Sequence, residues 1–456
     1  MITLRPYQSR DIERVREALR SNRAVVYVAP TGSGKTVLFS FIAKSASERA
    51  RRAWILVHRQ ELLTQTSRAL TEFGVPHGLV SPQFTADPLA PIQVASVQTI
   101  VRRLGKFVAP DLIVVDENHH AVSPTYRMIL DACPKARVLG VTATPERADG
   151  RGLGEVFQAM VLGPTVAELT AGGFLAPAAV FAPPQVADLT GLKTRMGDWE
   201  REAVAERMDR PTITGDAVDH YRRICAGAPA VAFCASVAHA EHVAGIFSAA
   251  GFRAASVDGN HRAGIKALER GEVQVLTSCD LISEGLDIPA ITAAILLRPT
   301  KSLGLYRQQV GRSLRPAPGK ARAIILDHVG NTMRHGLPDA EIEWSLEGRA
   351  VRKGKPGDEK PLAVKQCPEC YACHPPAPHC PECGTVYETA GRAAPEHVGG
   401  ELVEITAIDK DREKAARNRE IGRAKSLREL EELARKMGYK PGWAWHRWNA
   451  RQRRAG

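Results

Sequence analysis

The chain has 456 residues, which favours about three folded units, and 44% of them are hydrophobic, which excludes wholesale disorder. Its 62 Lys and Arg against 50 Asp and Glu give a formal charge of +12, which favours a polyanionic partner such as nucleic acid. The N-terminus shows no apolar signal segment, and no run of about 18 apolar residues occurs, so we expect a cytoplasmic protein that does not enter a membrane.

Short apolar, β-branched runs alternate with helix-like stretches along the first part of the chain. A helical pattern covers residues 11–20, and the runs occupy residues 24–29, 54–57, 92–97, 112–115 and 138–141. Such runs are typical of strands buried on both faces of a parallel sheet. The rhythm restarts with runs at residues 230–234, 273–277, 291–297 and 321–326. We therefore predict two α/β lobes in series, joined near the Gly/Pro-rich stretch 163–184.

The segment APTGSGKT at residues 29–36 directly follows a predicted strand and directly precedes a helical stretch. This order predicts a Walker A loop, which binds the phosphates of ATP through backbone N–H groups. Lys35 would reach the β- and γ-phosphates, and the Thr36 hydroxyl would bind Mg²⁺. The loop residues predicted to bind the nucleotide are Gly32, Ser33, Gly34, Lys35 and Thr36.

Residues 116–120 read DENHH, directly after the predicted strand at 112–115. Two carboxylates at the carboxyl edge of a parallel sheet would lie beside the phosphate loop. Asp116 is predicted to complete the Mg²⁺ shell, and Glu117 to orient or deprotonate the attacking water.

These segments belong to an ordered series that resembles the motifs of superfamily 2 DExH-box helicases. The series consists of RPYQ (5–8), VHRQE (57–61), SVQT (96–99), DENH (116–119), TATP (142–145), FCAS (233–236), SCDLISEGLDIP (278–289) and YRQQVGRSLR (306–315). RPYQ and TATP are similar to those of the group that contains XPB, phage UvsW and the restriction-enzyme motor subunits. Asn118 departs from this group, which usually has Ala there.

The resemblance implies two RecA-like lobes with ATP bound between them, and it assigns roles in both. Arg5 and Gln8 would read adenine, and His119 would link the ATP site to the second lobe. Thr142 and Thr144 would join the lobes through hydrogen bonds. In the second lobe, Gly285 and Asp287 would approach the nucleotide, and Gln308, Arg312 and Arg315 would act in catalysis, the two arginines as arginine fingers. Nucleic acid would be contacted by Arg59, Ser96, Gln98, Ser236 and Thr277.

Five of the nine cysteines are clustered between residues 367 and 383. Two CxxC pairs point four thiolates at one tetrahedral ion, which predicts a structural Zn²⁺ site. Its ligands would be Cys367, Cys370, Cys380 and Cys383. Cys373, His374 and His379 are competing ligands, and iron is the alternative metal.

The C-terminal tail is basic: residues 410–456 contain 15 Lys and Arg but 6 Asp and Glu. Residues 426–436 predict a capped amphipathic helix. Three of the six Trp follow between residues 439 and 448. Trp443 and Arg447 would stack on bases and neutralise phosphates. The alternative, which we favour, is that these Trp form the small core of the tail.

These patterns together predict an ATP-dependent DNA helicase or translocase. By resemblance, branched DNA in replication, recombination or repair is the expected substrate. An ATP-switched adaptor that recruits partners through the ribbon and tail, and an RNA helicase, are the alternatives. The predicted domains are two RecA-like lobes (1–165 and 166–347), a linker (348–365), a zinc ribbon (366–390) and a basic helical tail (391–456).

Overall fold

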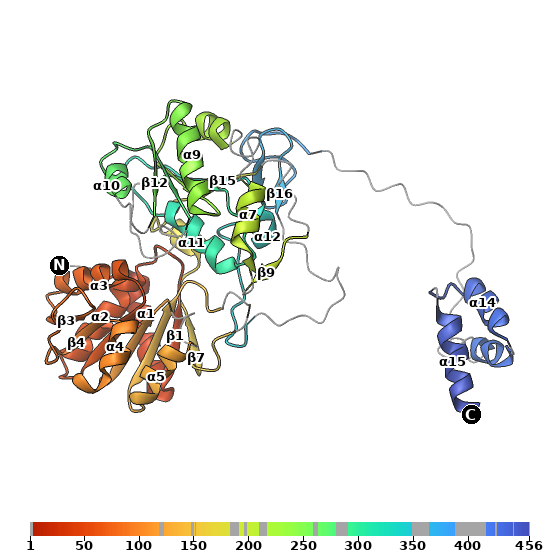
Figure 1. Ribbon diagram of the computed structural model, residues 1–456, viewed down its shortest axis with the longest axis horizontal. Helices are drawn as coiled ribbons and strands as arrows, with labels where there is room; N and C mark the ends of the chain where they lie inside the picture. The colour runs from red at the N-terminus through yellow and green to blue at the C-terminus, as the bar shows by residue number, and fades with distance from the viewer. Residues whose placement is uncertain are drawn as a thin grey trace. The chain divides into compact units, whose positions relative to one another are not determined.

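The computed structural model describes residues 3–117, 123–146, 150, 152–182, 191–195, 198–208, 217–258, 263–279, 291–348, 364–387, 416–424, 426–440 and 442–455. The chain divides into two compact units, residues 1–387 and 388–456. The first unit contains two successive sheets flanked by helices (Figure 1), which confirms the predicted α/β class with two tandem parallel-sheet lobes. None of the described helices combines the length and apolar character that a membrane span requires.

The first lobe contains a parallel sheet in which the described strands follow the order β3-β4-β2-β5-β6-β1-β7. The strands are β1 (Ala24–Val28), β2 (Ala53–Val57), β3 (His77–Val80), β4 (Ile92–Ser96), β5 (Leu112–Asp116), β6 (Arg137–Thr142) and β7 (Ala159–Leu162). The helices are α1 (Pro6–Ser21), α2 (Lys35–Ser47), α3 (Gln60–Glu72), α4 (Val97–Ile100), α5 (Pro124–Ala132) and a 3-10 helix η1 (Val101–Lys106). Every residue of β1, β2 and β5 is buried, as expected for strands covered on both faces.

The second lobe has six described parallel strands in the order β12-β13-β11-β14-β15-β8. These are β8 (Ala178–Phe181), β11 (Ala230–Phe233), β12 (Ala254–Val257), β13 (Val275–Ser278), β14 (Ala293–Leu296) and β15 (Ala323–Asp327). Its helices are α6 (Val166–Ala171), α7 (Arg201–Met208), η3 (Tyr221–Cys225), α9 (Val237–Ala249), α10 (Ala263–Glu269), α11 (Leu303–Ser313) and α12 (Asn331–His335). Strand β9 (Thr194–Arg195) pairs antiparallel with β10 (Asp198–Trp199).

The cysteine-rich segment continues the sheet of the second lobe. Strand β17 (Ala372–His374) pairs antiparallel with β8, and β16 (Lys365–Gln366) pairs with β17. Cys367 and Cys380 are buried in the same hydrophobic core as residues of β15. The Arg322 guanidinium also donates to both carboxylate oxygens of Glu382, each at 2.9 Å. The ribbon is therefore packed into the second lobe, a connection that the sequence did not predict.

The C-terminal unit contains a small helical core of its own. It has helical residues at 416–423, α14 (Leu427–Lys436) and α15 (Trp443–Ala455). The Ser426 hydroxyl accepts a hydrogen bond from the backbone N–H of Glu429 at 3.2 Å, which confirms the predicted helix cap. Trp443 and Trp448 pack against buried Leu430 and its neighbours, as the favoured alternative predicted, whereas Trp445 is 53% exposed.

Candidate active site

The predicted phosphate loop lies between β1 and α2, as its sequence requires. Gly32 and Gly34 have φ angles of +87° and +76°, in the left-handed region that glycine adopts without strain. Gly34 is the N-cap of α2, so the backbone N–H groups of the first helical turn are available to an anion. The positive end of the helix dipole adds to this preference, and the loop therefore has the geometry of a phosphate site.

The Lys35 ammonium folds back over the loop that carries it. Its Nζ donates to the carbonyls of Ala29 and Pro30, at 3.0 and 3.1 Å. Burial lowers the pKa of Lys35, and the negative charges of Glu117 and Asp116 partly oppose that change. A bound phosphate would strengthen the opposing effect and favour the charged ammonium.

Asp116 ends β5, and Glu117 follows it at the same sheet edge. Burial raises the pKa of Asp116 to about 7, and the charge of Glu117 adds to the increase. Glu117 has φ +52°, a left-handed conformation that costs a residue with a side chain roughly 1–2 kcal/mol. Two adjacent carboxylates that are costly to ionise together suit a cation, so Asp116 and Thr36 fit a Mg²⁺ site.

The N-terminal RPYQ segment contacts the phosphate loop directly. Buried Gln8 donates from Nε2 to the Gly34 carbonyl at 3.2 Å, and its Oε1 accepts from the Arg5 N–H at 2.9 Å. The Tyr7 hydroxyl donates to the Ser33 carbonyl at 2.6 Å. Tyr7 was not predicted as a site residue, although its place beside Gln8 in RPYQ was a usable signal.

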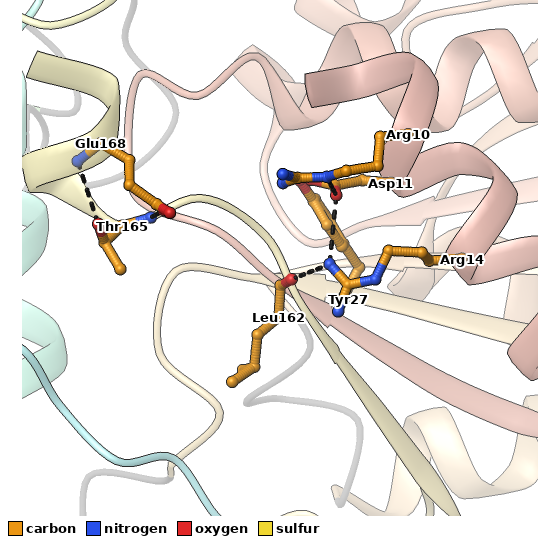
Figure 2. A network of polar contacts seen from close by, with 7 residues as sticks. All are labelled: Arg10, Asp11, Arg14, Tyr27, Leu162, Thr165 and Glu168. Carbon is orange, nitrogen blue, oxygen red and sulfur yellow. Dashed lines mark hydrogen bonds and ion pairs between the residues drawn. The ribbon is translucent and has the colours of Figure 1, made fainter. Parts of the chain in front are cut away.

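A buried carboxylate anchors the helix that carries this segment (Figure 2). Asp11 is 0% exposed and accepts from the Tyr27 hydroxyl at 3.0 Å and from Arg10 Nε at 2.9 Å. Arg14 lies 3.4 Å from the same carboxylate and donates to the Leu162 carbonyl at 2.7 Å. Tyr27 is in β1, which leads into the phosphate loop, and Leu162 ends β7, after which the chain crosses to the second lobe. The network therefore joins α1, the phosphate-loop strand and the start of the interlobe connection.

Helix α11 of the second lobe lies against the phosphate loop. A methyl group at Gly311 would be 2.7 Å from Cβ of Thr31, closer than carbon atoms can pack, so the helix touches the loop there. A methyl group at Gly304 would lie 2.9 Å from Oγ1 of Thr144, so a second contact joins α11 to the TATP segment. Thr142 instead donates to the Thr144 carbonyl at 2.9 Å, within its own turn.

The structure brings the two predicted arginine fingers to the phosphate loop. Arg315 Cγ would be 3.6 Å from a methyl group at Gly32, and both Arg312 and Arg315 act electrostatically on Lys35. Burial lowers the pKa of Arg315 to about 10. Gln308 is buried in α11, as is Arg312. His119, Gly285 and Asp287 lie outside the described residues.

Three of the residues predicted to contact nucleic acid in the two lobes lie where a strand passes into a helix. Arg59, Ser96 and Ser236 are the N-cap residues of α3, α4 and α9. The Ser96 hydroxyl donates to the exposed Gln98 side chain at 2.8 Å. Thr277 is fully buried in β13 and donates to the Ala240 carbonyl at 2.6 Å, so its side chain is in the interior.

Four cysteine sulfurs converge in the ribbon. The sulfurs of Cys367, Cys370, Cys380 and Cys383 all lie within 4.8 Å of one another. Two of the separations, Cys367 to Cys383 and Cys370 to Cys380, are 3.6 Å. Ligands at about 2.3 Å from a tetrahedral zinc ion are about 3.8 Å apart, so this arrangement fits zinc.

Fold and site thus define a two-lobed ATPase with a phosphate loop in one lobe and arginines supplied by the other. Comparison with known proteins agrees with this class. Residues 1–147 match the family described as the Res subunit of type III restriction enzymes, and residues 217–317 match the helicase conserved C-terminal domain.

Relatives in phage and yeast extend the match. A 51.5 kDa protein of a Lactococcus phage is 36% identical over 354 residues, which cover 76% of this chain and 74% of that protein. IRC3 of Saccharomyces cerevisiae, a candidate ATP-dependent helicase, is 30% identical over 410 residues, 80% of this chain and 60% of IRC3. A fragment of a candidate HsdR restriction subunit from Vibrio vulnificus has the same fold, with a TM-score of 0.59 and 22% identity over 74% of this chain and 67% of that one. The chain belongs to the superfamily 2 helicases, and it is a nucleic-acid-dependent ATPase of that family.

Proposed function

We propose that the protein is an ATP-dependent DNA translocase that remodels branched DNA. The observation that carries this proposal is the contact of α11 with the phosphate loop, through Gly311 and Thr31. Because both lobes contribute to one nucleotide site, ATP binding closes the lobes and hydrolysis releases them. A DNA 3′–5′ translocase, XPB2 of Sulfurisphaera tokodaii, is 31% identical over 153 residues, which supports DNA as the track.

The chemistry needs charge stabilisation and a positioned water rather than a covalent intermediate. Lys35 and the first turn of α2 hold the phosphates, and Glu117 orients the attacking water. Arg312 and Arg315 stabilise the charge that develops on the γ-phosphoryl group, an effect worth about 10³–10⁵ in rate in comparable systems. Thr36 and Asp116 would hold Mg²⁺, which would supply positive charge to the phosphates.

The ribbon and the tail have different tasks in this proposal. Four thiolates hold a structural zinc ion that stabilises the second lobe. The tail contributes affinity for DNA, because α15 carries arginines and no acidic residue and exposes Trp445. The expected location is the cytoplasm.

One experiment tests the proposal: the steady-state ATPase rate with single-stranded DNA, duplex, fork, four-way junction and RNA at equal nucleotide concentration. We expect stimulation by DNA, greatest with the fork or junction, and loss of the stimulated rate in Lys35→Ala and Glu117→Gln. Stimulation by RNA alone would refute the DNA proposal. A rate indifferent to every nucleic acid would favour the adaptor alternative.

A further inference from the structure

Lys320 lies in the loop between α11 and β15, and its ammonium binds the end of α11. Its Nζ donates to the carbonyls of Ser313 and of Arg315, the latter at 2.7 Å. It also donates to the carbonyl of Ile291, before β14, at 2.6 Å. An ammonium has three N–H donors, so these carbonyls use all of them.

A tight turn sends the Lys320 side chain back to the helix. The Lys320 N–H donates to the Ala317 carbonyl at 3.1 Å, with Pro318 and Gly319 between them. Gly319 has φ +74°, and proline followed by left-handed glycine is the sequence signature of a type II turn. The turn directs the Lys320 side chain back towards the end of α11. Because Pro318 already restricts the backbone of the loop, little conformational entropy is lost when the ammonium forms its hydrogen bonds.

The bonds from Lys320 satisfy backbone carbonyls at the end of α11. The last carbonyls of an α-helix have no partner within the helix, and a positive charge near them is favourable. Here the Leu314 carbonyl, between the two that Lys320 binds, accepts from the N–H of Ala176 at 2.7 Å. Three successive carbonyls are therefore held from two directions, and the held backbone includes that of Arg315.

We propose that Lys320 is a positioning residue for ATP hydrolysis, which fixes the end of α11 so that the Arg315 side chain lies at the phosphate loop. The inference rests on the proposed function, in which Arg315 acts on the γ-phosphoryl group. Within the described residues, the hydrogen bonds of the Lys320 ammonium go to backbone carbonyls, so Lys320 acts through the arginine. A misplacement of about 1 Å in a catalytic group can lower a rate by about 10²-fold, so a clamp on its backbone matters.

The test compares Lys320→Met with two other variants, Lys320→Arg and Arg322→Met. Arg322 is the control because it is a cation in the same loop, but its guanidinium binds Glu382 and not the end of α11. We expect Lys320→Met to lower the DNA-stimulated kcat at least about 10-fold while KM for ATP changes less than about 3-fold. Lys320→Arg should recover part of kcat because a guanidinium can also donate to several carbonyls. Arg322→Met should keep the wild-type kcat. Tm of each variant shows whether the fold is retained.

A double-mutant cycle separates positioning from general stability. If Lys320 acts through the arginine, adding Lys320→Met to Arg315→Ala should lower the residual rate less than about 2-fold. An equal loss in both backgrounds, or a wild-type kcat in Lys320→Met, would overturn the inference. Neither outcome touches the proposed function, which fails instead if Lys35→Ala keeps the DNA-stimulated rate.

Discussion

Gly311 of α11 lies directly against Thr31 of the phosphate loop, so near that a methyl group on Gly311 would be 2.7 Å from Cβ of Thr31. Glycine inside a helix costs about 1 kcal/mol relative to alanine. The glycine is unfavourable for the helix itself, so we infer that its role is to let α11 approach the phosphate loop. The second lobe can approach the phosphate loop this closely because residue 311 has no side-chain methyl group.

Gly311→Ala should separate the folding of α11 from its docking on the phosphate loop. We expect unchanged or slightly higher stability, since alanine favours the helix, together with at least a 10-fold loss in kcat because Arg312 and Arg315 are pushed from the loop. Urea denaturation and ATPase kinetics measure the two effects. Gly245→Ala in α9 is the matched control, because nothing lies within 4 Å of its added methyl group. Wild-type kcat in Gly311→Ala would show that the lobes do not need this approach.

The buried carboxylate of Asp11 predicts a graded loss of stability. Asp11→Ala leaves the Tyr27 hydroxyl without its acceptor and should cost about 2–3 kcal/mol. Tyr27→Phe removes one donor but leaves Asp11 its bonds from Arg10 and Arg14, so it should cost about 1 kcal/mol. Glu13→Ala, on the same helix, breaks an exposed ion pair with Arg16 and should cost less than about 1 kcal/mol. Urea unfolding free energies give the order, and equal values for Asp11→Ala and Glu13→Ala would contradict it.

The sequence predicted the chemistry of the site better than its connections. The phosphate loop and Asp116 follow from local order, because a buried strand, a glycine loop and a helix are adjacent along the chain. The Asp11 network and the hydrogen bonds of Lys320 join segments that are far apart in sequence, so a local sequence pattern could not predict them. Of the strands that were not predicted, β3, β7 and β12 lie at sheet edges and are only partly buried, so fewer of their residues need to be apolar. The pairing of the ribbon with β8 was also not predicted, because the sequence of a strand does not show which other strand it pairs with.

Removal of metal should destabilise the second lobe rather than release a separate domain. Cys367 and Cys380 are buried in the core that includes β15, and β17 is hydrogen-bonded to β8. Chelation, or Cys380→Ser, should therefore lower Tm of residues 1–387, with metal analysis giving about one zinc per chain before treatment. Cys133→Ala, in the first lobe and outside the cluster, should keep the metal. Loss of zinc with an unchanged Tm would show that the ribbon folds without the metal. If metal analysis finds iron, the four cysteines bind iron and not zinc.

The exposed tryptophan of the tail predicts a contact with unpaired bases. Trp443 and Trp448 pack in the core of the unit, whereas Trp445 is exposed and its indole can stack on a base. The His446 ring packs edge-to-face against this indole, with the ring centroids 5.1 Å apart. Base stacking on an aromatic side chain contributes about 1–3 kcal/mol, so Trp445→Ala should weaken single-stranded DNA binding about 5- to 100-fold and blunt duplex far less. Trp445→Phe should keep much of the affinity, and Arg447→Ala should lower the salt dependence of binding to both substrates. Fluorescence anisotropy at several salt concentrations measures all three. An unchanged affinity of Trp445→Ala for single strands would leave the tail with charge alone as its means of binding DNA.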